Sequence, residues 1–191
     1  MNLQCIREDE MGNFYTSFTV HSAAHDDVVK AMNGRTAAVS PAMNGYTVVW
    51  DSECESQDDK VLSRVGLHLA TSLGASVLAV LNHDDDILMY WLYSPKGKVD
   101  EYNSTPGYWD GGDLSPSGGD VELLVKAMAP KASREAVDRI LRKQEYVFAF
   151  ERHADLMAAL GLPPFAAMGY KYISRGEVPD GLEEHELTFT R

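Results

Sequence analysis

The residues best suited to chemistry in this sequence are a histidine followed by three aspartates, His83-Asp84-Asp85-Asp86. Imidazole and carboxylate groups hold divalent metals when several of them converge on one ion. A second acidic loop at 110–113 adds two aspartates. If the chain folds the loops together, they predict a divalent-metal site and a metal-assisted hydrolase, in which the metal activates water or polarises a substrate oxygen. The candidate ligands are His83, Asp84, Asp86, Asp110 and Asp113.

Both acidic loops also have a structural interpretation. Asn and Asp favour tight turns because their side chains bond nearby backbone groups, and residues 82–86 stand between two predicted strands. The segment Asp-Gly-Gly-Asp at 110–113 lacks the later acids and the closing Glu of an EF-hand loop. Its glycines are typical of a flexible turn. We therefore expect turns at both places, with the metal site as the alternative.

Aromatic residues gather in the same part of the chain. Tyr and Trp are favoured in ligand pockets and in protein interfaces. The candidates for contact with a ligand or partner are Tyr102, Tyr108 and Trp109. If they line a pocket, the protein would be a small-molecule sensor. Packing in the core is the alternative, with Tyr108 and Trp109 as exceptions because they lie in a predicted loop.

No other catalytic signature is present in the sequence. There is no P-loop, no GxGxxG, no GxSxG and no HExxH motif. Cys54 stands between Glu53 and Glu55, whose charges raise a thiol pKa and weaken it as a nucleophile. Cys5 and Cys54 have no CxxC spacing and are interpreted as free thiols in a reducing cytoplasm. Catalytic residues therefore stay unassigned, and an enzyme is the less favoured interpretation.

Hydrophobic patterning predicts six strands, at 16–20, 35–40, 46–51, 76–81, 87–94 and 98–104. One helix follows Ser22, and a second is opened by a capping box of Ser56 and Asp59 and closed by Gly74. This order is that of an α+β, ferredoxin-like βαββαβ sheet extended by an antiparallel hairpin. We expect the spatial order 98–104, 87–94, 76–81, 16–20, 46–51, 35–40.

Residues 105–191 are predicted to be mainly helical. After a Gly-rich loop at 107–119, Asp120 and Ser133 are expected to open two short helices. Alternating aromatic residues predict a strand at 146–150, and a last helix is expected around 156–160.

Both alternating sets of residues in 87–93 are apolar or aromatic, so both faces of the predicted sheet need cover. We expect one domain, 1–191, in which an extended sheet at 14–104 is covered by the C-terminal segment 105–191. The alternative cover is a second copy of the chain, which would make the protein a homodimer.

The chain carries 17 Lys and Arg against 29 Asp and Glu, a net charge of −12. This excess argues against binding to nucleic acid or to an anionic membrane, and leaves basic proteins and divalent cations as partners. Residues 1–14 have acids and no apolar core, so we expect no secretory signal. No apolar run approaches the roughly 20 residues of a membrane span. The expected location is the cytoplasm.

Several short motifs resemble a block found in uncharacterised bacterial proteins of similar length. They are HDDDIL at 83–88, DEYNS at 100–104, PGYW at 106–109, GD at 119–120, RH at 152–153 and GLP at 161–163. The resemblance covers roughly the last 110 residues. It implies a bacterial cytoplasmic protein whose strands and C-terminal helices form one unit, and it implies no activity.

The favoured function is that of a non-enzymatic acidic binding protein with a basic protein partner, for example an inhibitor or immunity-type protein. The metal-assisted hydrolase and the small-molecule sensor are the alternatives. Many acids stand at predicted helix starts and turns, where folding alone explains them. The sequence therefore places the site at the loops 82–86 and 110–113 beside the aromatic strands.

Overall fold

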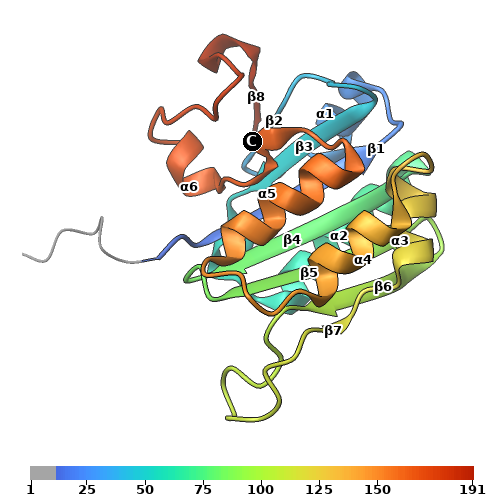
Figure 1. The fold of residues 1–191 in the computed structure, drawn as a ribbon. Helices are drawn as coiled ribbons and strands as arrows, with labels where there is room; N and C mark the ends of the chain where they lie inside the picture. The colour runs from blue at the N-terminus through green and yellow to red at the C-terminus, as the bar shows by residue number, and fades with distance from the viewer. Residues whose placement is uncertain (1–11) are drawn as a thin grey trace, which may run out of the picture.

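The computed structural model describes residues 12–191, so Cys5 and most of the acidic start of the chain lie outside the described residues. Within this range the chain is an α+β structure with one eight-stranded sheet and six α-helices (Figure 1). The strands are β1 (Tyr15–His21), β2 (Ala37–Val39), β3 (Tyr46–Asp51), β4 (Ser76–His83), β5 (Ile87–Ser94), β6 (Gly97–Asn103), β7 (Ser117–Gly118) and β8 (Thr188–Thr190). The helices are α1 (His25–Ala31), α2 (Asp59–Leu73), α3 (Val121–Met128), α4 (Arg134–Arg142), α5 (Ala149–Leu160) and α6 (Tyr170–Ile173).

The strands lie in the order β7-β6-β5-β4-β1-β3-β2-β8, and every neighbouring pair is antiparallel. All six expected strands are present, in the expected order. The sheet is larger than expected because β7 and β8 extend it at its two edges. Both come from the C-terminal segment, and strands of two and three residues are too short to show an alternating pattern. The segment 105–191 is therefore not purely a helical cover.

Two local predictions were wrong. Residues 146–150 form no strand: Ala149 begins α5, and its backbone N–H donates to the carbonyl of Asp85 instead of to a neighbouring strand. The aromatic alternation there puts Phe148 and Phe150 at the surface. The helix α2 begins at Asp59 with Asp58 as its N-cap, which accepts from the N–H of Lys60. The expected Ser56 cap lies one turn earlier, in a 3₁₀ turn.

The two faces of the sheet are covered by different helices (Figure 1). Alternate residues of β5 divide between two hydrophobic clusters. Leu88, Tyr90 and Leu92 pack with the buried side chains of α3, α4 and α5. Trp91 and Tyr93 pack with those of α1 and α2. The C-terminal helices thus cover the face that the first two helices leave open.

Among residues 12–191, no helix combines the length and the apolar character that crossing a membrane requires.

Candidate functional site

A pocket of about 890 Å³ lies at the end of the sheet where β4 turns into β5. The two strands contribute Leu81, Met89 and Trp91, which belong to the hydrophobic cluster under α1 and α2 or pack against it. The pocket therefore opens on the α1–α2 side of the sheet. Its volume lies in the range of sites that take small molecules or side chains, roughly 300–1,000 Å³.

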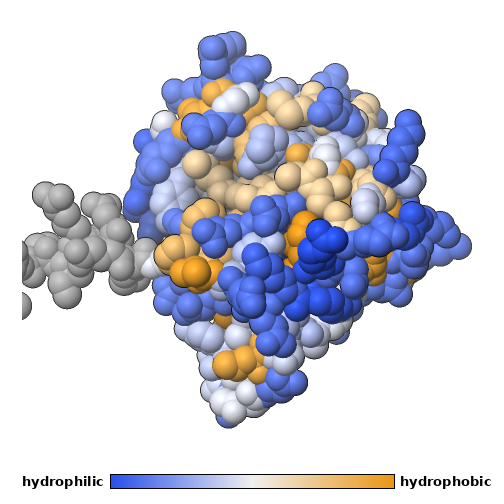
Figure 2. Space-filling view, in the orientation of Figure 1, coloured by the Kyte–Doolittle hydropathy of each residue, from blue (hydrophilic) through white to orange (hydrophobic). Residues whose placement is uncertain are grey.

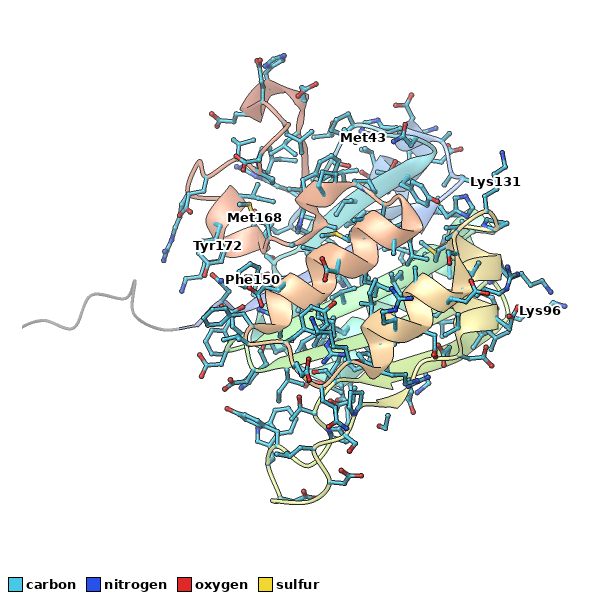
Figure 3. All side chains as sticks on the ribbon, viewed as in Figure 1. Met43, Lys96, Lys131, Phe150, Met168 and Tyr172 are labelled. Atoms are coloured by element: carbon cyan, nitrogen blue, oxygen red, sulfur yellow. The ribbon has the colours of Figure 1, made fainter. Side chains whose placement is uncertain are left out.

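Aromatic rings from three further segments complete the walls of this pocket. Phe14 precedes β1, Trp109 belongs to the loop between β6 and β7, and Tyr172 lies in α6. Tyr172 also lines a smaller cavity of about 180 Å³ together with Phe150 and Met168, and these three side chains lie near one another at one end of the molecule (Figure 3). With Trp91, four aromatic rings surround the larger pocket.

Charged groups of both signs line the same pocket. The acids are Glu55, Asp58 and Asp59, and the bases are Lys60 and Lys171. Only Glu55 is half-buried, whereas the other four are exposed. The charge nearest the interior is therefore the negative charge of Glu55.

The start of α6 holds the carboxylate of Glu55. The backbone N–H of Tyr170 donates to Oε1 at 3.1 Å and that of Lys171 to Oε2 at 3.3 Å. Gly169 permits this approach, because a Cβ there would lie 3.0–3.1 Å from both oxygens. Burial raises the pKa of Glu55 above its ordinary value, and the two N–H groups oppose that rise. The side-chain hydroxyl of Thr16 opposes the rise as well, and the carboxylate keeps about one acceptor site for another donor.

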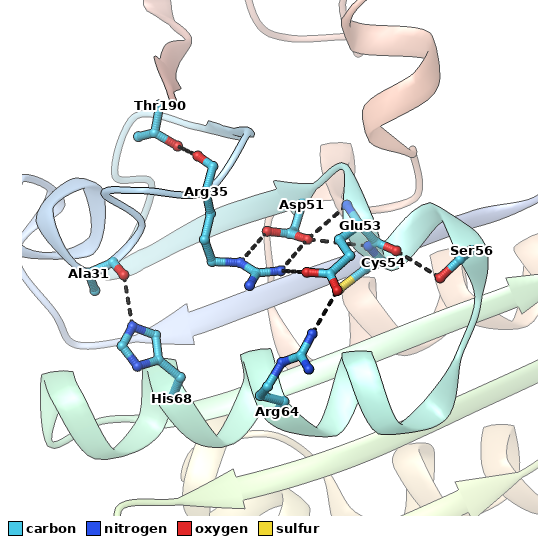
Figure 4. A network of polar contacts seen from close by, with 9 residues as sticks. All are labelled: Ala31, Arg35, Asp51, Glu53, Cys54, Ser56, Arg64, His68 and Thr190. Atoms are coloured by element: carbon cyan, nitrogen blue, oxygen red, sulfur yellow. Dashed lines mark hydrogen bonds and ion pairs between the residues drawn. The ribbon is translucent and has the colours of Figure 1, made fainter.

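A polar network around the buried carboxylate of Asp51 anchors the 3₁₀ turn Glu53–Ser56, which carries Glu55 (Figure 4). Arg35 donates to both carboxylate oxygens of Asp51, at 2.7 and 2.8 Å, and to Glu53 at 2.9 Å. Asp51 is buried, and its Oδ1 also accepts from the backbone N–H groups of Glu53 and Cys54. This network fixes the turn at the end of β3 and with it the position of Glu55.

Cys54 in this turn is a buried free thiol. Burial, with a smaller contribution from Asp51, raises its pKa. The expected direction is confirmed, but the main cause is burial and not the neighbouring glutamates. A buried, protonated thiol is a poor nucleophile.

His83 lies among aromatic rings at the pocket wall. Its ring centroid is 5.0 Å from that of Phe14 and 5.6 Å from that of Trp109. Its Nδ1 is 2.6 Å from Oε1 of Gln57. Because a carbonyl oxygen only accepts, this bond places the proton of the neutral ring on Nδ1 and leaves Nε2 as an acceptor.

The two acidic loops meet at this end of the sheet, but not through converging carboxylates. Tyr108 donates its hydroxyl to Oδ2 of Asp86 at 2.9 Å, and His83 contacts Trp109. Asp110 and Asp113 accept backbone N–H groups two residues further on in their own loop, at 2.9 and 2.8 Å. Those two aspartates therefore shape the loop, as turn residues do.

In the run 84–86 the buried carboxylate belongs to Asp85, the residue left out of the predicted ligand set. It accepts from the backbone and side chain of Asn13 and from Asn82. Asp84 and Asp85 both have left-handed backbone angles, with φ of 54° and 56°, as in a tight turn. In residues 12–191 no group of three or more His, Cys, Asp or Glu side chains is arranged to hold a metal ion.

The three predicted aromatic contact residues lie in different surroundings. Trp109 is 62 % exposed and lines the pocket. Tyr108 is 38 % exposed and packs against Trp109, with ring centroids 5.3 Å apart. Tyr102 is buried between the sheet and α4, and donates its hydroxyl to the carbonyl of Leu141. Tyr102 therefore cannot contact a ligand in this structure.

Sequence reasoning missed Glu55, Trp91, Phe14 and Tyr172 as pocket residues. They come from four separate segments, and no spacing between them is fixed by a single helix or strand. Trp91 gave a partial signal, because it alternates with the core residues of β5 and so faces the side of the sheet that only two helices cover.

Comparison with known proteins finds no matching family model, no matching curated protein and no matching solved structure. The geometry of the pocket supplies aromatic walls and hydrogen-bond acceptors, which are means of binding.

Proposed function

We propose that this chain is a non-enzymatic binding protein that recognises a basic partner protein, and that the pocket at the end of the sheet receives a cationic side chain of that partner. The observation that carries the proposal is the pairing of aromatic rings with the half-buried carboxylate of Glu55 in one pocket. A cation gains from ring faces as well as from carboxylates, and a desolvated site strengthens both. An inhibitor or immunity-type role would use such a contact.

Two features outside the pocket support a protein partner. The net charge of −12 favours association with a basic surface. An exposed apolar patch of Val147, Phe148 and Phe150 lies beside the smaller cavity that shares Tyr172 with the pocket (Figure 2). Exposed apolar patches of this kind mark interaction surfaces.

A small-molecule sensor is the second candidate, because the pocket volume suits a ligand of drug size. No observation favours the metal-assisted hydrolase.

The fold assignment forms part of the same proposal. We infer a ferredoxin-like unit, β1-α1-β2-β3-α2-β4, enlarged at both edges. The order β4-β1-β3-β2 within the sheet supports this, together with the antiparallel pairing of each neighbouring pair.

The test is an NMR titration of the ¹⁵N-labelled chain with pentapeptides that carry one variable residue between blocked glycines. Trp91 and Trp109 report on the pocket through their indole N–H signals, and Trp50, which is buried in the cluster on the opposite face, is the internal control. A lysine or arginine peptide should shift both pocket indoles and spare Trp50, and added salt should weaken the effect. The glutamate peptide should do nothing.

If neither basic peptide shifts the pocket indoles, the proposal is wrong. A shift produced equally by the glutamate peptide would favour the sensor. Glu135→Gln is the matched charge control, since Glu135 is an exposed acid in α4 and does not line the pocket.

A further inference from the structure

We infer that the group received by the pocket is a guanidinium, so that the partner presents an arginine and not a lysine. This inference rests on the proposed function and specifies its ligand. It follows from the shape of the walls and from the number and placement of the acceptors.

The walls suit a flat cation that is weakly hydrated. Four aromatic side chains line the pocket; Trp91 is 6 % exposed and packs in the core, so the rings with open surface are those of Phe14, Trp109 and Tyr172. An ammonium is a compact, strongly hydrated charge, and it loses more hydration than a guanidinium does on entering such surroundings. A guanidinium is planar, holds water less tightly and stacks on aromatic faces.

The acceptors suit a fork of N–H donors. Each oxygen of Glu55 accepts one backbone N–H from α6, and the buried hydroxyl of Thr16 is a further donor beside the same carboxylate, so the group is held in place with about one acceptor site left for a ligand. A guanidinium can give one N–H to that carboxylate and keep its other donors for a second acceptor. His83 adds a separate acceptor at the same wall, because Gln57 fixes its proton on Nδ1.

The two lysines in the lining do not reverse the preference. Lys60 and Lys171 are exposed, so their ammonium groups can stay in water at the rim, while Glu55 is half-buried. An anionic ligand would meet Glu55, Asp58 and Asp59 as well as the lysines. With three acids against two bases, the lining favours a cation.

The experiment compares four pentapeptides in the same NMR titration of the full chain, with arginine, lysine, citrulline or glutamate at the centre. Citrulline has the shape of arginine without its charge, so it separates stacking from charge recognition. We expect the arginine peptide to bind about tenfold more tightly than the lysine or citrulline peptide, the ratio that one good charge-assisted contact gives.

Two variants test whether Glu55 is the residue that recognises the charge of the arginine peptide. Glu55→Gln should reduce the affinity for the arginine peptide about tenfold and bring it to that of citrulline, while Glu135→Gln should leave it unchanged. Equal affinity for arginine and citrulline, or tighter binding of lysine, would overturn the inference. Tighter binding of lysine would leave the proposed function standing, whereas failure of both basic peptides would remove the two together.

Discussion

Arg152 and Glu55 are charged side chains that lie wholly or partly inside the protein. They differ in how far the protein itself satisfies their hydrogen-bonding groups. Arg152 is 4 % exposed and lies between the sheet and α4. It donates to the hydroxyl of Tyr102 and to the carbonyls of Ile140, Leu141 and Lys143, which end α4. Glu55 accepts two backbone N–H groups, has the hydroxyl of Thr16 beside it, and stands next to a pocket of about 890 Å³.

The difference separates structural from functional polar groups. A guanidinium placed against the last carbonyls of a helix satisfies acceptors that the helix leaves unpaired and complements its dipole. Its donors are occupied by the protein itself. The carboxylate at the pocket keeps acceptor capacity and has space next to it, so a ligand can complete its hydrogen bonding. We therefore expect substitutions of Arg152 to cost stability and substitutions of the pocket residues to cost binding.

Arg152→Met should have the largest effect on stability. It leaves the carbonyls of Ile140 and Lys143 without this donor and removes one of the two partners of the buried Tyr102 hydroxyl, at an expected cost of about 3 kcal/mol in the free energy of unfolding. Glu55→Gln should cost less, about 1 kcal/mol, because one backbone N–H of α6 loses its acceptor while the half-buried charge is removed. Urea unfolding at pH 7 measures both. Equal costs would break the comparison.

His153 follows Arg152 in α5, and its burial makes the stability of the protein sensitive to pH. It is 1 % exposed, and its Nδ1 is hydrogen-bonded to the hydroxyl of Tyr15 at 2.9 Å. Burial lowers the pKa of His153 to about 3, from an ordinary value of 6.5. The folded state therefore holds this ring neutral, and its contribution to stability is complete above pH 6.5 and is lost as the pH falls toward 3.

Between pH 6.5 and pH 5 this loss amounts to about 2 kcal/mol, at about 1.4 kcal/mol per pH unit for one proton. His153→Gln keeps an acceptor for Tyr15 and removes the titration. The difference between the variant and the parent chain in urea unfolding at pH 7 and pH 5 isolates the histidine. Parallel pH profiles for the two proteins would contradict the assignment.

The sequence predicted five of the six central strands from β-prone or apolar runs, and the sixth, at 98–104, from the turn residues 95–97 that precede it. It assigned Tyr102 to the site, although the pairing of Tyr102 with Tyr90 in β6 and β5 puts it on the core side. The sequence could not show which of the acids at 84–86 is buried, because the left-handed backbone at Asp84 and Asp85 decides which carboxylate points inward. Trp109, which the sequence singled out as an aromatic residue in a loop, lines the pocket.

Trp109→Ala should separate binding from stability. Because Trp109 is 62 % exposed, we expect the free energy of unfolding to change by no more than about 0.5 kcal/mol. The affinity for the arginine peptide should fall about tenfold, since the cation loses a ring face. Leu114→Ala is the matched control, as Leu114 is 58 % exposed in the same loop and does not line the pocket. A similar loss of affinity in both variants would assign the effect to the loop as a whole.

Tyr108→Phe should have the smallest effect and bears on how the loop holds Trp109 at the pocket. The variant loses the hydroxyl that donates to Asp86 and keeps the ring that packs on Trp109. Global unfolding should be unchanged, because both groups lie at the surface. The backbone N–H of Gly111 donates to the carbonyl of Gly107 within the loop. Its hydrogen should exchange faster in the variant, because opening of the loop no longer requires breaking the hydrogen bond between Tyr108 and Asp86.

Asp86→Asn retains an acceptor for Tyr108, so the amide of Gly111 should exchange in this control as it does in the parent chain. If the amide of Gly111 exchanges at the parent rate in Tyr108→Phe, ring packing alone positions Trp109, and the acidic turn contributes nothing to the pocket through Asp86.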